Sequence, residues 1–596
     1  MNVLEMFYDE NDLVTTPSRT AKSISQVAEN ITVITAEDIK AMNAHSVADV
    51  LNTVTGLQLS SGTGPGAYST LAVQGSEARH VLVMIDGVSQ NNIGDGPPDV
   101  GALRIQQIER IEIVKGPASS SWGSSLGGVI NIITKSPDDS RKFGGQVYLS
   151  YGEKNFGDYR TELSGTKGIF GYYISGGGLI TDGLHENTPL RSGNIYSKFN
   201  LQPSQDTTLT LTVGYETGDR GFGRFSGDYQ GMPYTLDSRN EYDYFLSTLS
   251  LIHSISDSLS IEAGFRNSMR SIKRFDKLSF TGIEENSIKA NEVTFGGSAR
   301  LIWQQKNNTM VLGSDLDFGK LDSPQIKDGS QRLDKWAFYV NDTIKLGIFS
   351  VTPGLRYDYT STNGDFWSPS LGATCAVTDN TILRGYISRG FSIPYLSATF
   401  GTNLGVTANP DLKLEKVWSY SLGFETAALK YFWLKSTYFR HNISDTLTLN
   451  STYDMWINSG KQRREGVEIE AKTSPVYHLA LSAGFTYINA KNLDTDEVVK
   501  DVPRYTYDVG LHYDNPRYLR ANLTGRYIDY NASPENNGKY TTMIWDFNLS
   551  KEFRLSQGMT AEAFFTAHNL FNGAQYAMDF YKNPARWFEG GLRFSF

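Results

Sequence analysis

The stretch from Lys115 to Gly128, KGPASSSWGSSLGG, holds the residue types whose spacing comes nearest to a chemical function. Such a loop can cradle a phosphate with its backbone amides, present a serine as a nucleophile, or let two backbones pack closely. Each Gly-Lys pair of the chain is followed by Leu, Gln or Tyr, so no GxxxxGK[ST] phosphate loop exists. No His–acid pair accompanies the serines in the sequence. We therefore interpret the loop as a packing device.

The residues that commonly bind metals are scattered along the chain. Eight histidines occur without HExxH or any other ligand spacing, at positions 45, 80, 185, 253, 441, 478, 512 and 568. The single cysteine, Cys375, excludes an intrachain disulfide and any multi-cysteine metal site. We expect no catalytic centre, no metal site and no cofactor, and hence a protein that is not an enzyme.

Composition narrows the class of protein. The 596 residues carry a net charge of −9, which argues against a chain-wide nucleic-acid surface. Gly (57), Tyr (33) and Phe (31) are frequent, as in proteins of many strands and turns. No run of 18 apolar residues predicts a membrane-spanning helix. The first residues lack a basic segment and an apolar core, so the protein stays inside the cell or a leader has been removed.

From about residue 140 onward, apolar and polar residues alternate with a period of two. In the last ten residues, Phe588, Leu592, Phe594 and Phe596 share one face, and Glu589, Arg593 and Ser595 share the other. About 22 such segments are joined alternately by tight turns and by long connections, among them 182–192, 218–240 and 272–289. This pattern predicts a transmembrane β-barrel with both barrel termini at the short-turn end. A soluble propeller would show blade repeats of about 40–50 residues, which are absent.

The first 137 residues have a different pattern, which is mixed α/β. TAEDIKAMNAHSVADVLNTVTG predicts a helix, with Thr35 as N-cap, Asp38 in the capping box and Gly56 as the stop. HVLVMIDGV predicts a short buried strand. Because a barrel of this width needs a filling, we expect this domain to occupy the lumen. The predicted division is 1–20 for a coupling segment, 21–137 for a plug domain and 138–596 for the barrel.

These stretches resemble the TonB-dependent outer-membrane receptor family. The resemblance rests above all on IERIEIVKGPASSSWGSSLGGVINIITK (108–135), and also on ITVITAEDIKAMNAHSVADVLNTVTGLQL, HVLVMIDGV, FSIPYL, NPDLKLE, GKQRREGVEIE, HNLFN and the terminal Phe596. It implies a monomeric importer of scarce, bulky nutrients in the outer membrane of a Gram-negative bacterium. It also implies a periplasmic TonB-type protein as energy-coupling partner, contact with outer-membrane lipid and no nucleic-acid partner. The alternative is an uncoupled barrel that acts as a passive pore or as a surface binding protein.

The resemblance also implies roles for particular residues. NDLVTTPS is similar to a TonB box, with Asp12, Leu13, Val14, Thr15 and Thr16 as its body. It is a good strand-addition peptide because β-branched residues run up to Pro17. Family plugs carry arginines at the positions of Gln74 and Lys115 that pair with barrel glutamates. We therefore expect a plug–barrel lock, and its members are Arg110, Lys115, Glu415 and Glu468.

The ligand is expected on the outward loops of plug and barrel. The candidate residues are aromatic, cationic or amide-bearing, which suits a large, flat or anionic metal chelate; they are Tyr68, Asn91, Asn92, Asp95, Arg220, Phe222, Arg224, Phe225, Tyr229 and Tyr234. The compact length and HVLVMIDGV are most similar to the cobalamin-receptor branch. We rank cobalamin-type corrinoids first and ferric siderophores second. Haem ranks lower because residues 397–408 lack a histidine.

Overall fold

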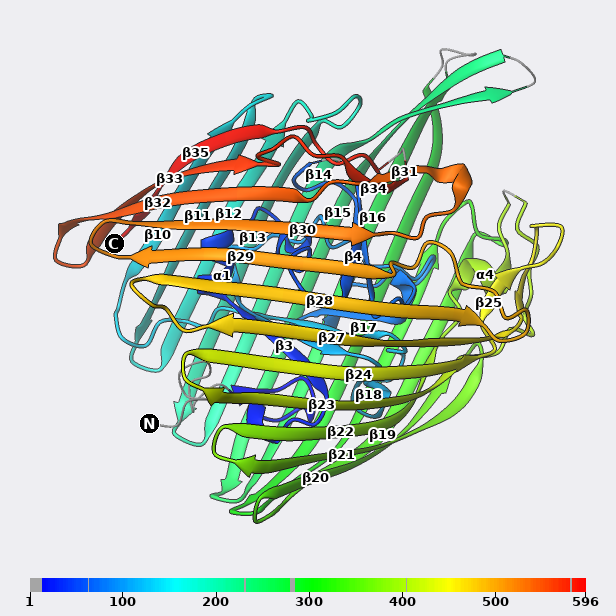
Figure 1. The fold of residues 1–596 in the computed structure, drawn as a ribbon. Helices are drawn as coiled ribbons and strands as arrows, with labels where there is room; N and C mark the ends of the chain where they lie inside the picture. The colour runs from blue at the N-terminus through cyan, green and yellow to red at the C-terminus, as the bar shows by residue number, and fades with distance from the viewer. Residues whose placement is uncertain (1–12, 63, 230–231, 279–283, 404, 579–580) are drawn as a thin grey trace.

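The computed structural model describes residues 13–596 apart from 63, 230–231, 279–283, 404 and 579–580; the side chains of 225–229, 232–234 and 284–287 are not described either. Within these residues, 22 antiparallel strands form one closed barrel, and the N-terminal domain lies inside it (Figure 1). This confirms the fold class predicted from the sequence.

The barrel strands lengthen and shorten systematically around the wall. In chain order they are β10 (Gly144–Gly152), β11 (Phe156–Lys167), β12 (Phe170–Thr181), β13 (Leu190–Ser204), β14 (Thr207–Tyr229), β15 (Met232–Ser256), β16 (Leu259–Leu278), β17 (Glu284–Gln305), β18 (Asn308–Asp322), β19 (Ser330–Leu346), β20 (Phe349–Thr360), β21 (Gly364–Thr378), β22 (Thr381–Ser392), β23 (Glu415–Leu429), β24 (Phe432–Ser444), β27 (Lys461–Thr473), β28 (Leu479–Asn492), β29 (Tyr505–Asn515), β30 (Leu519–Asp529), β32 (Ile544–Ser556), β33 (Met559–His568) and β35 (Trp587–Ser595). The barrel closes where β10 pairs with β35.

The period-two pattern places each side chain as the sequence predicts. In β35, Leu592 is 57% exposed on the outer surface, whereas Glu589 and Arg593 are buried on the inner side. Because successive residues of a strand point to opposite faces, the apolar set faces outward and the polar set faces the plug. An inward polar face and an outward apolar face distinguish a membrane barrel from a soluble sandwich.

The connections follow the predicted alternation, with one difference. Two-residue turns join strands at one end, for example at 205–206, 306–307 and 347–348. At the other end, 218–240 and 272–289 were expected to be loops, but most of these residues continue the strands β14 to β17. The ladder between β14 and β15 persists past a bulge at Gly221/Arg224. Polar, Gly-containing sequence therefore extends the sheet here because cross-strand pairing outweighs low strand propensity.

The plug is built around a five-stranded sheet in the order β3-β8-β9-β6-β7. The strands are β3 (Asn30–Thr35), β8 (Ile108–Lys115), β9 (Gly128–Thr134), β6 (Val81–Ile85) and β7 (Val88–Ser89), and a separate hairpin joins β4 (Leu57–Ser61) to β5 (Ser69–Val73). Only β6 and β9 run parallel. Ile111, Ile113 and Ile130 are fully buried in its main core. The predicted division at residue 137 falls between β9 and β10.

The predicted N-terminal helix is divided into two short ones. Thr35 and Asp38 form the expected capping box of α1 (Ala36–Met42), but Asn43 adopts a left-handed conformation with φ 50°. Ser46 and Asp49 then form a second capping box, which starts α2 (Val47–Leu51). The break occurs because Asn tolerates φ > 0 and Ser favours an N-cap. It leaves His45 in the link between the helices.

The remaining elements are short. They are β1 (Leu13–Val14), β2 (Lys22–Ser23), η2 (Ile24–Gln26), η3 (Ala78–His80), α3 (Ser119–Trp122), α4 (Leu396–Phe400), β25 (Leu447–Leu449), β26 (Trp456–Asn458), η4 (Pro534–Asn536), β31 (Asn537–Tyr540) and β34 (Gln575–Met578). Among the helices that the structure describes, none is long and apolar enough to cross a membrane.

Candidate functional site

The segment expected to couple to TonB is docked against the plug by one carboxylate. Leu13 and Val14 form β1, which pairs only with β2. Glu112 on β8 is fully buried, and its Oε2 accepts from Thr15 N at 2.9 Å, from Thr16 N at 2.8 Å and from Thr16 Oγ1 at 2.6 Å. Asp12 lies outside the described residues.

The loop after β8 fastens the next residues of the same segment. Trp122 Nε1 donates to Thr16 O at 2.7 Å, and Ser121 Oγ donates to Pro17 O at 2.8 Å. The guanidinium of Arg19 lies 4.1 Å from the Trp122 ring centre and pairs with Asp315 on the barrel at 2.8 Å. The coupling segment is therefore held by plug and barrel together.

The serines of this loop make structural contacts. Ser119 Oγ accepts from Phe391 N at 3.2 Å, and Ser124 Oγ accepts from Ile393 N at 3.1 Å, which ties the loop to the barrel. Gly123–Gly127 has the Gly-x-Ser-x-Gly spacing of a nucleophile elbow, but Ser125 is fully buried and donates to Gly123 O at 3.2 Å. The loop is a packing device, because its hydroxyls are used to join plug, barrel and coupling segment.

One glutamate of the expected lock lies at the centre of a plug–barrel contact. Glu468 accepts from Lys115 Nζ at 3.0 Å, from Gln74 Nε2 at 2.9 Å and from Asn30 Nδ2 at 2.8 Å. Lys115 also reaches Glu470 at 3.2 Å. Burial alone would lower the pKa of Lys115, but the two glutamates outweigh it and raise that pKa.

The other two members of the expected lock lie elsewhere. Glu415 pairs with Arg79 and His80, both at 2.9 Å, and not with the cations predicted for it. Arg110 pairs with Glu112 and Glu109 inside the plug, so the expectation that it contacts a barrel glutamate is wrong. Arg110 and Lys115 are five positions apart on β8, and an odd spacing places two side chains on opposite faces of a strand.

Three of the predicted ligand-binding residues form one cluster between plug and barrel. The rings of Tyr68 and Phe222 lie 5.6 Å apart, and the guanidinium of Arg220 lies within 5.7 Å of both. Arg220 is only 2% exposed and is engaged by the plug, through the Asp99 carboxylate and through Gly66 O at 3.3 Å. The cluster therefore anchors the loop that carries Tyr68 under the outer opening.

The remaining predicted binding residues are dispersed. Asn91 accepts from Val83 N and donates to two backbone carbonyls, and Asn92 accepts from Gly94 N, so both amides order their own loop. Asp95 is exposed, and the exposed Arg224 pairs with Asp237 at 2.8 Å. The side chains of Phe225, Tyr229 and Tyr234 lie outside the described residues.

A cavity of about 420 Å³ lies between the plug and the wall formed by β13 to β22. Asn91 and Arg270 line it, and so do Arg19 and Trp122, which hold the coupling segment. The cavity therefore adjoins both the plug loop that starts at Asn91 and the residues that fasten the coupling segment.

Several functional contacts were missed from the sequence. Glu112, Gln74 and Asn30 act through buried hydrogen bonds, and a single polar residue within a strand gives no sign of its distant partner. Two groups of histidines and carboxylates also converge between plug and barrel in the described part of the chain, namely His45–His568–Glu589 and Glu77–His80–Glu415. One sequence signal could have pointed to both groups. His45 and His80 lie in the plug domain, and that domain was expected to face the polar inner surface of the barrel.

Comparison with known proteins agrees with this architecture. A family described as "TonB dependent receptor-like, beta-barrel" matches residues 142–570, and one described as "TonB-dependent Receptor Plug Domain" matches residues 23–129.

Solved structures share the fold at low sequence identity. A variant of the ferric enterobactin receptor PfeA from Pseudomonas aeruginosa is similar with a TM-score of 0.78 and 20% identity, over 98% of this chain and 100% of that chain. The siderophore receptor PirA from Acinetobacter baumannii gives 0.76 and 18%, over 95% and 98%. The PirA receptor of Pseudomonas aeruginosa gives 0.71 and 20%, over 95% and 99%.

The matched families, the closed barrel and the enclosed plug point to the same conclusion. Receptors of this kind are transporters of the Gram-negative outer membrane, and not enzymes, and they work with a TonB partner. The chain belongs to the TonB-dependent receptor family.

Proposed function

We propose that this receptor imports a bulky ferric chelate of the siderophore type and that residues 12–16 are the strand taken by a TonB-type protein. Energised import, as opposed to passive passage, requires a segment that can leave the plug and pair with a partner. The observation that carries the proposal is the attachment of Leu13–Thr16, which pairs with one two-residue strand and is otherwise held by hydrogen bonds to three side chains, Glu112, Trp122 and Asn131.

The position of this segment is favourable for a periplasmic partner. Lys22 of β2 donates to Thr352 at 2.9 Å, and Thr352 lies close to the two-residue turn at 347–348. The C-terminus also lies at the end of the barrel with short turns (Figure 1). Short turns mark the periplasmic side of an outer-membrane barrel. Leu13 is 46% exposed there, so a partner can reach this residue before the segment is released.

The ligand class is inferred from chemistry at the outer side. The exposed Arg224 supplies a cationic group, and Tyr68 and Phe222 supply aromatic groups that the buried Arg220 holds in place. The sequence adds three more aromatic residues in the same region, Phe225, Tyr229 and Tyr234. Such groups favour flat, anionic chelates. The similar structures are siderophore receptors, and this supports ferric siderophores ahead of the cobalamin-type corrinoids that the sequence ranked first. Haem ranks third.

An uptake assay in cells that lack their own siderophore receptors tests both the proposed ligand class and the proposed coupling segment. We expect iron uptake from ferric enterobactin or a related chelate, and loss of uptake with retained binding when residues 11–18 are deleted. Deletion of residues 2–9, which has the same length, is the control and should leave uptake intact. Uptake that survives the first deletion would indicate a passive pore. Uptake of cyanocobalamin in place of the ferric chelates would overturn the ligand class and leave the coupling segment supported.

A further inference from the structure

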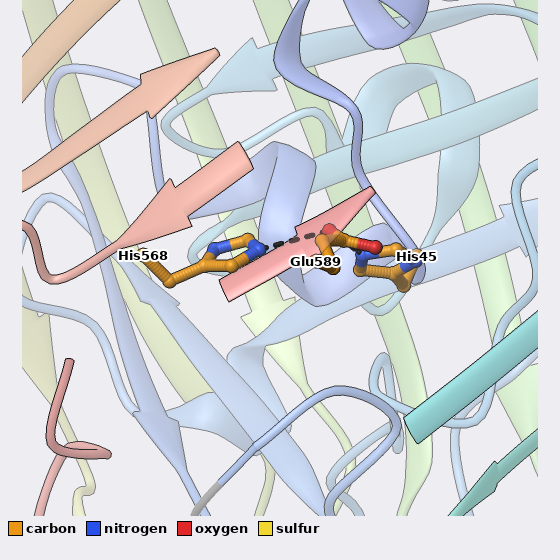
Figure 2. Close-up of side chains that lie close together, drawn as sticks. All are labelled: His45, His568 and Glu589. Carbon is orange, nitrogen blue, oxygen red and sulfur yellow. Dashed lines mark hydrogen bonds and ion pairs between the residues drawn. The ribbon is translucent and has the colours of Figure 1, made fainter. Parts of the chain in front are cut away.

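The group His45–His568–Glu589 joins the plug to the barrel at the seam where the barrel closes. His45 comes from the link between α1 and α2, His568 ends β33, and Glu589 lies on β35 (Figure 2). His45 Nε2 lies 2.8 Å and His568 Nε2 lies 2.9 Å from the same atom, Glu589 Oε1. All three ligand atoms lie within 4.8 Å of one another.

We propose that His45, His568 and Glu589 form a binding site for a divalent transition-metal ion of the Zn²⁺ type, which fastens the plug to the barrel wall. Two imidazole nitrogens and one carboxylate oxygen are a ligand set that Zn²⁺ accepts, with the fourth position left to water. Imidazole ligands also disfavour Ca²⁺ and Mg²⁺, which prefer oxygen alone.

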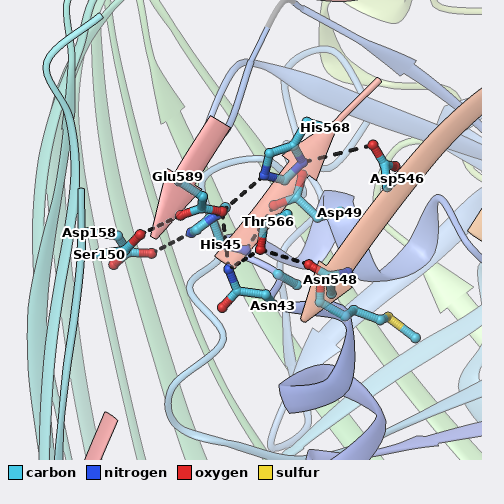
Figure 3. Close-up of polar contacts among 12 residues, drawn as sticks. Asn43, His45, Asp49, Ser150, Asp158, Asp546, Asn548, Thr566, His568 and Glu589 are labelled. Carbon is cyan, nitrogen blue, oxygen red and sulfur yellow. Dashed lines mark hydrogen bonds and ion pairs between the residues drawn. The ribbon is translucent and has the colours of Figure 1, made fainter. Parts of the chain in front are cut away.

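The second ring nitrogen of each histidine faces a carboxylate, as it does in most protein metal sites. His45 Nδ1 lies 2.7 Å from Asp158 Oδ2, and His568 Nδ1 lies 3.9 Å from Asp546 Oδ1 (Figure 3). The Asp158 contact favours the tautomer of His45 that presents Nε2 as a ligand and raises its basicity, whereas the Asp546 oxygen lies beyond hydrogen-bond distance of His568 Nδ1. Part of the outer shell of a metal site is therefore already in place.

The two rings are held in orientation by aromatic neighbours. His568 stacks on Trp587 with ring centres 4.0 Å apart and an angle of 9° between the planes. His45 meets Phe156 edge to face at 4.9 Å. A site whose ligands are already oriented loses little conformational entropy when it binds an ion.

The electrostatic environment favours positive charge at this point. His45 lies between two carboxylates, 2.8 Å from Glu589 Oε1 and 2.7 Å from Asp158 Oδ2. Arg160 and Arg104 pair with Asp158, and Arg160 Nη2 also lies 3.2 Å from His45 Nδ1. Among the described residues no Lys or Arg pairs with Glu589, whose oxygens are bonded by the two histidines, Asn43 and Ser150. An ion that binds Glu589 therefore does not have to displace a Lys or Arg side chain from this carboxylate.

The second group of histidine and carboxylates shows the contrast. In Glu77–His80–Glu415, the guanidinium of Arg79 bonds Glu415 Oε1 at 2.9 Å and also contacts Glu77. Arg464 approaches Glu77 to 4.0 Å. Guanidinium groups already occupy these carboxylates, so this group is an ion-pair contact and not a second metal site.

Metal titration of the untagged full-length receptor in detergent tests the proposal. After removal of metals with a chelator, we expect one Zn²⁺ per chain to compete with a fluorescent zinc indicator, and Co²⁺ to give the intense visible bands of a tetrahedral site. His568→Gln and Glu589→Gln should each weaken Zn²⁺ binding by at least about tenfold. Glu77→Gln, which alters the second group only, is the matched control and should bind as the parent does.

Two results would overturn the proposal. One is a parent protein that binds no Zn²⁺ at one equivalent, which would make the group a proton-held contact only. The other is unchanged affinity in both His568→Gln and Glu589→Gln. Titration of the parent protein decides whether the site binds metal even where a variant fails to fold.

Discussion

Replacing Glu112 by Gln should release the coupling segment while it preserves the shape of the plug. Glu112 Oε2 accepts four hydrogen bonds from Thr15 and Thr16, the longest at 3.5 Å from Thr15 Oγ1, and Oε1 accepts one from Arg110 Nε at 2.9 Å. A glutamine carbonyl can still accept, but the charge is lost. Hydrogen bonds to a charged group contribute about 1.5–3 kcal/mol, and neutral ones about 0.5–1.5 kcal/mol.

The difference in free energy between charged and neutral hydrogen bonds determines how far the undocked population rises. A loss of about 1 kcal/mol per bond over two or three bonds gives about 2–3 kcal/mol. Since every 1.4 kcal/mol is a factor of ten, the undocked population should rise about 30- to 150-fold.

Val14 provides the readout because it is only 1% exposed when docked. In a Cys375→Ser background, Val14→Cys should react with a maleimide at a rate proportional to the undocked population. Glu112→Gln should raise that rate by the factor given above. Glu109→Gln is the control, since Glu109 lies on the same strand, its side chain is 45% exposed and it pairs with Arg110. If the maleimide reaction rate of the Glu112→Gln variant is within about twofold of the parent rate, Glu112 does not hold the coupling segment in place.

Four further predictions concern coupling, packing and assembly. Leu13→Pro should abolish uptake and leave ligand affinity unchanged, because proline removes a backbone donor and restricts the preceding residue; normal uptake would show that the coupling strand lies elsewhere. Gly127→Val should lower the melting temperature or block folding, since a Cβ there would lie 2.5 Å from Ser76 Oγ; an unchanged melting curve would contradict this. Lys115→Met should destabilise the plug by about 3–5 kcal/mol, because it leaves the buried carboxylate of Glu468 without its cation. Denaturant unfolding measures this, and Glu468→Gln added to it should restore part of the loss. Phe594→Arg should reduce assembled barrel on heat-modifiability gels, because a cation on the lipid face costs up to about 2–4 kcal/mol; Ser595→Arg, on the opposite face, is its control.

The sequence by itself determined the architecture. Alternation such as Phe588, Leu592 and Phe594 against Glu589 and Arg593 is a local property, because side chains of a strand alternate whatever the strand pairs with. Short turns and helix caps such as Thr35–Asp38 are local too. The stretch from Ile108 to Lys135 identified the plug by resemblance, and with it the family.

The positions of the polar contacts were decided only by the tertiary structure. Lys115 meets Glu468, but Arg110 turns inward to Glu112, and Gln74 reaches the same glutamate as Lys115 without a charge. Whether a residue has an odd or an even position along β8 decides which face of the strand its side chain takes. The position of the plug inside the barrel decides which barrel residue that side chain contacts.

The histidines show the same limit most clearly. They have no ligand spacing in the sequence, and we expected no metal site. Yet His45 and Glu589, which are 544 positions apart, lie 2.8 Å from each other. Their meeting depends on the break after α1, on the register of β35 and on closure of the barrel, and each of these is a cross-strand or cross-domain relation. A one-dimensional pattern records which face a side chain takes, whereas the partner on that face is set by pairing between segments remote in the chain.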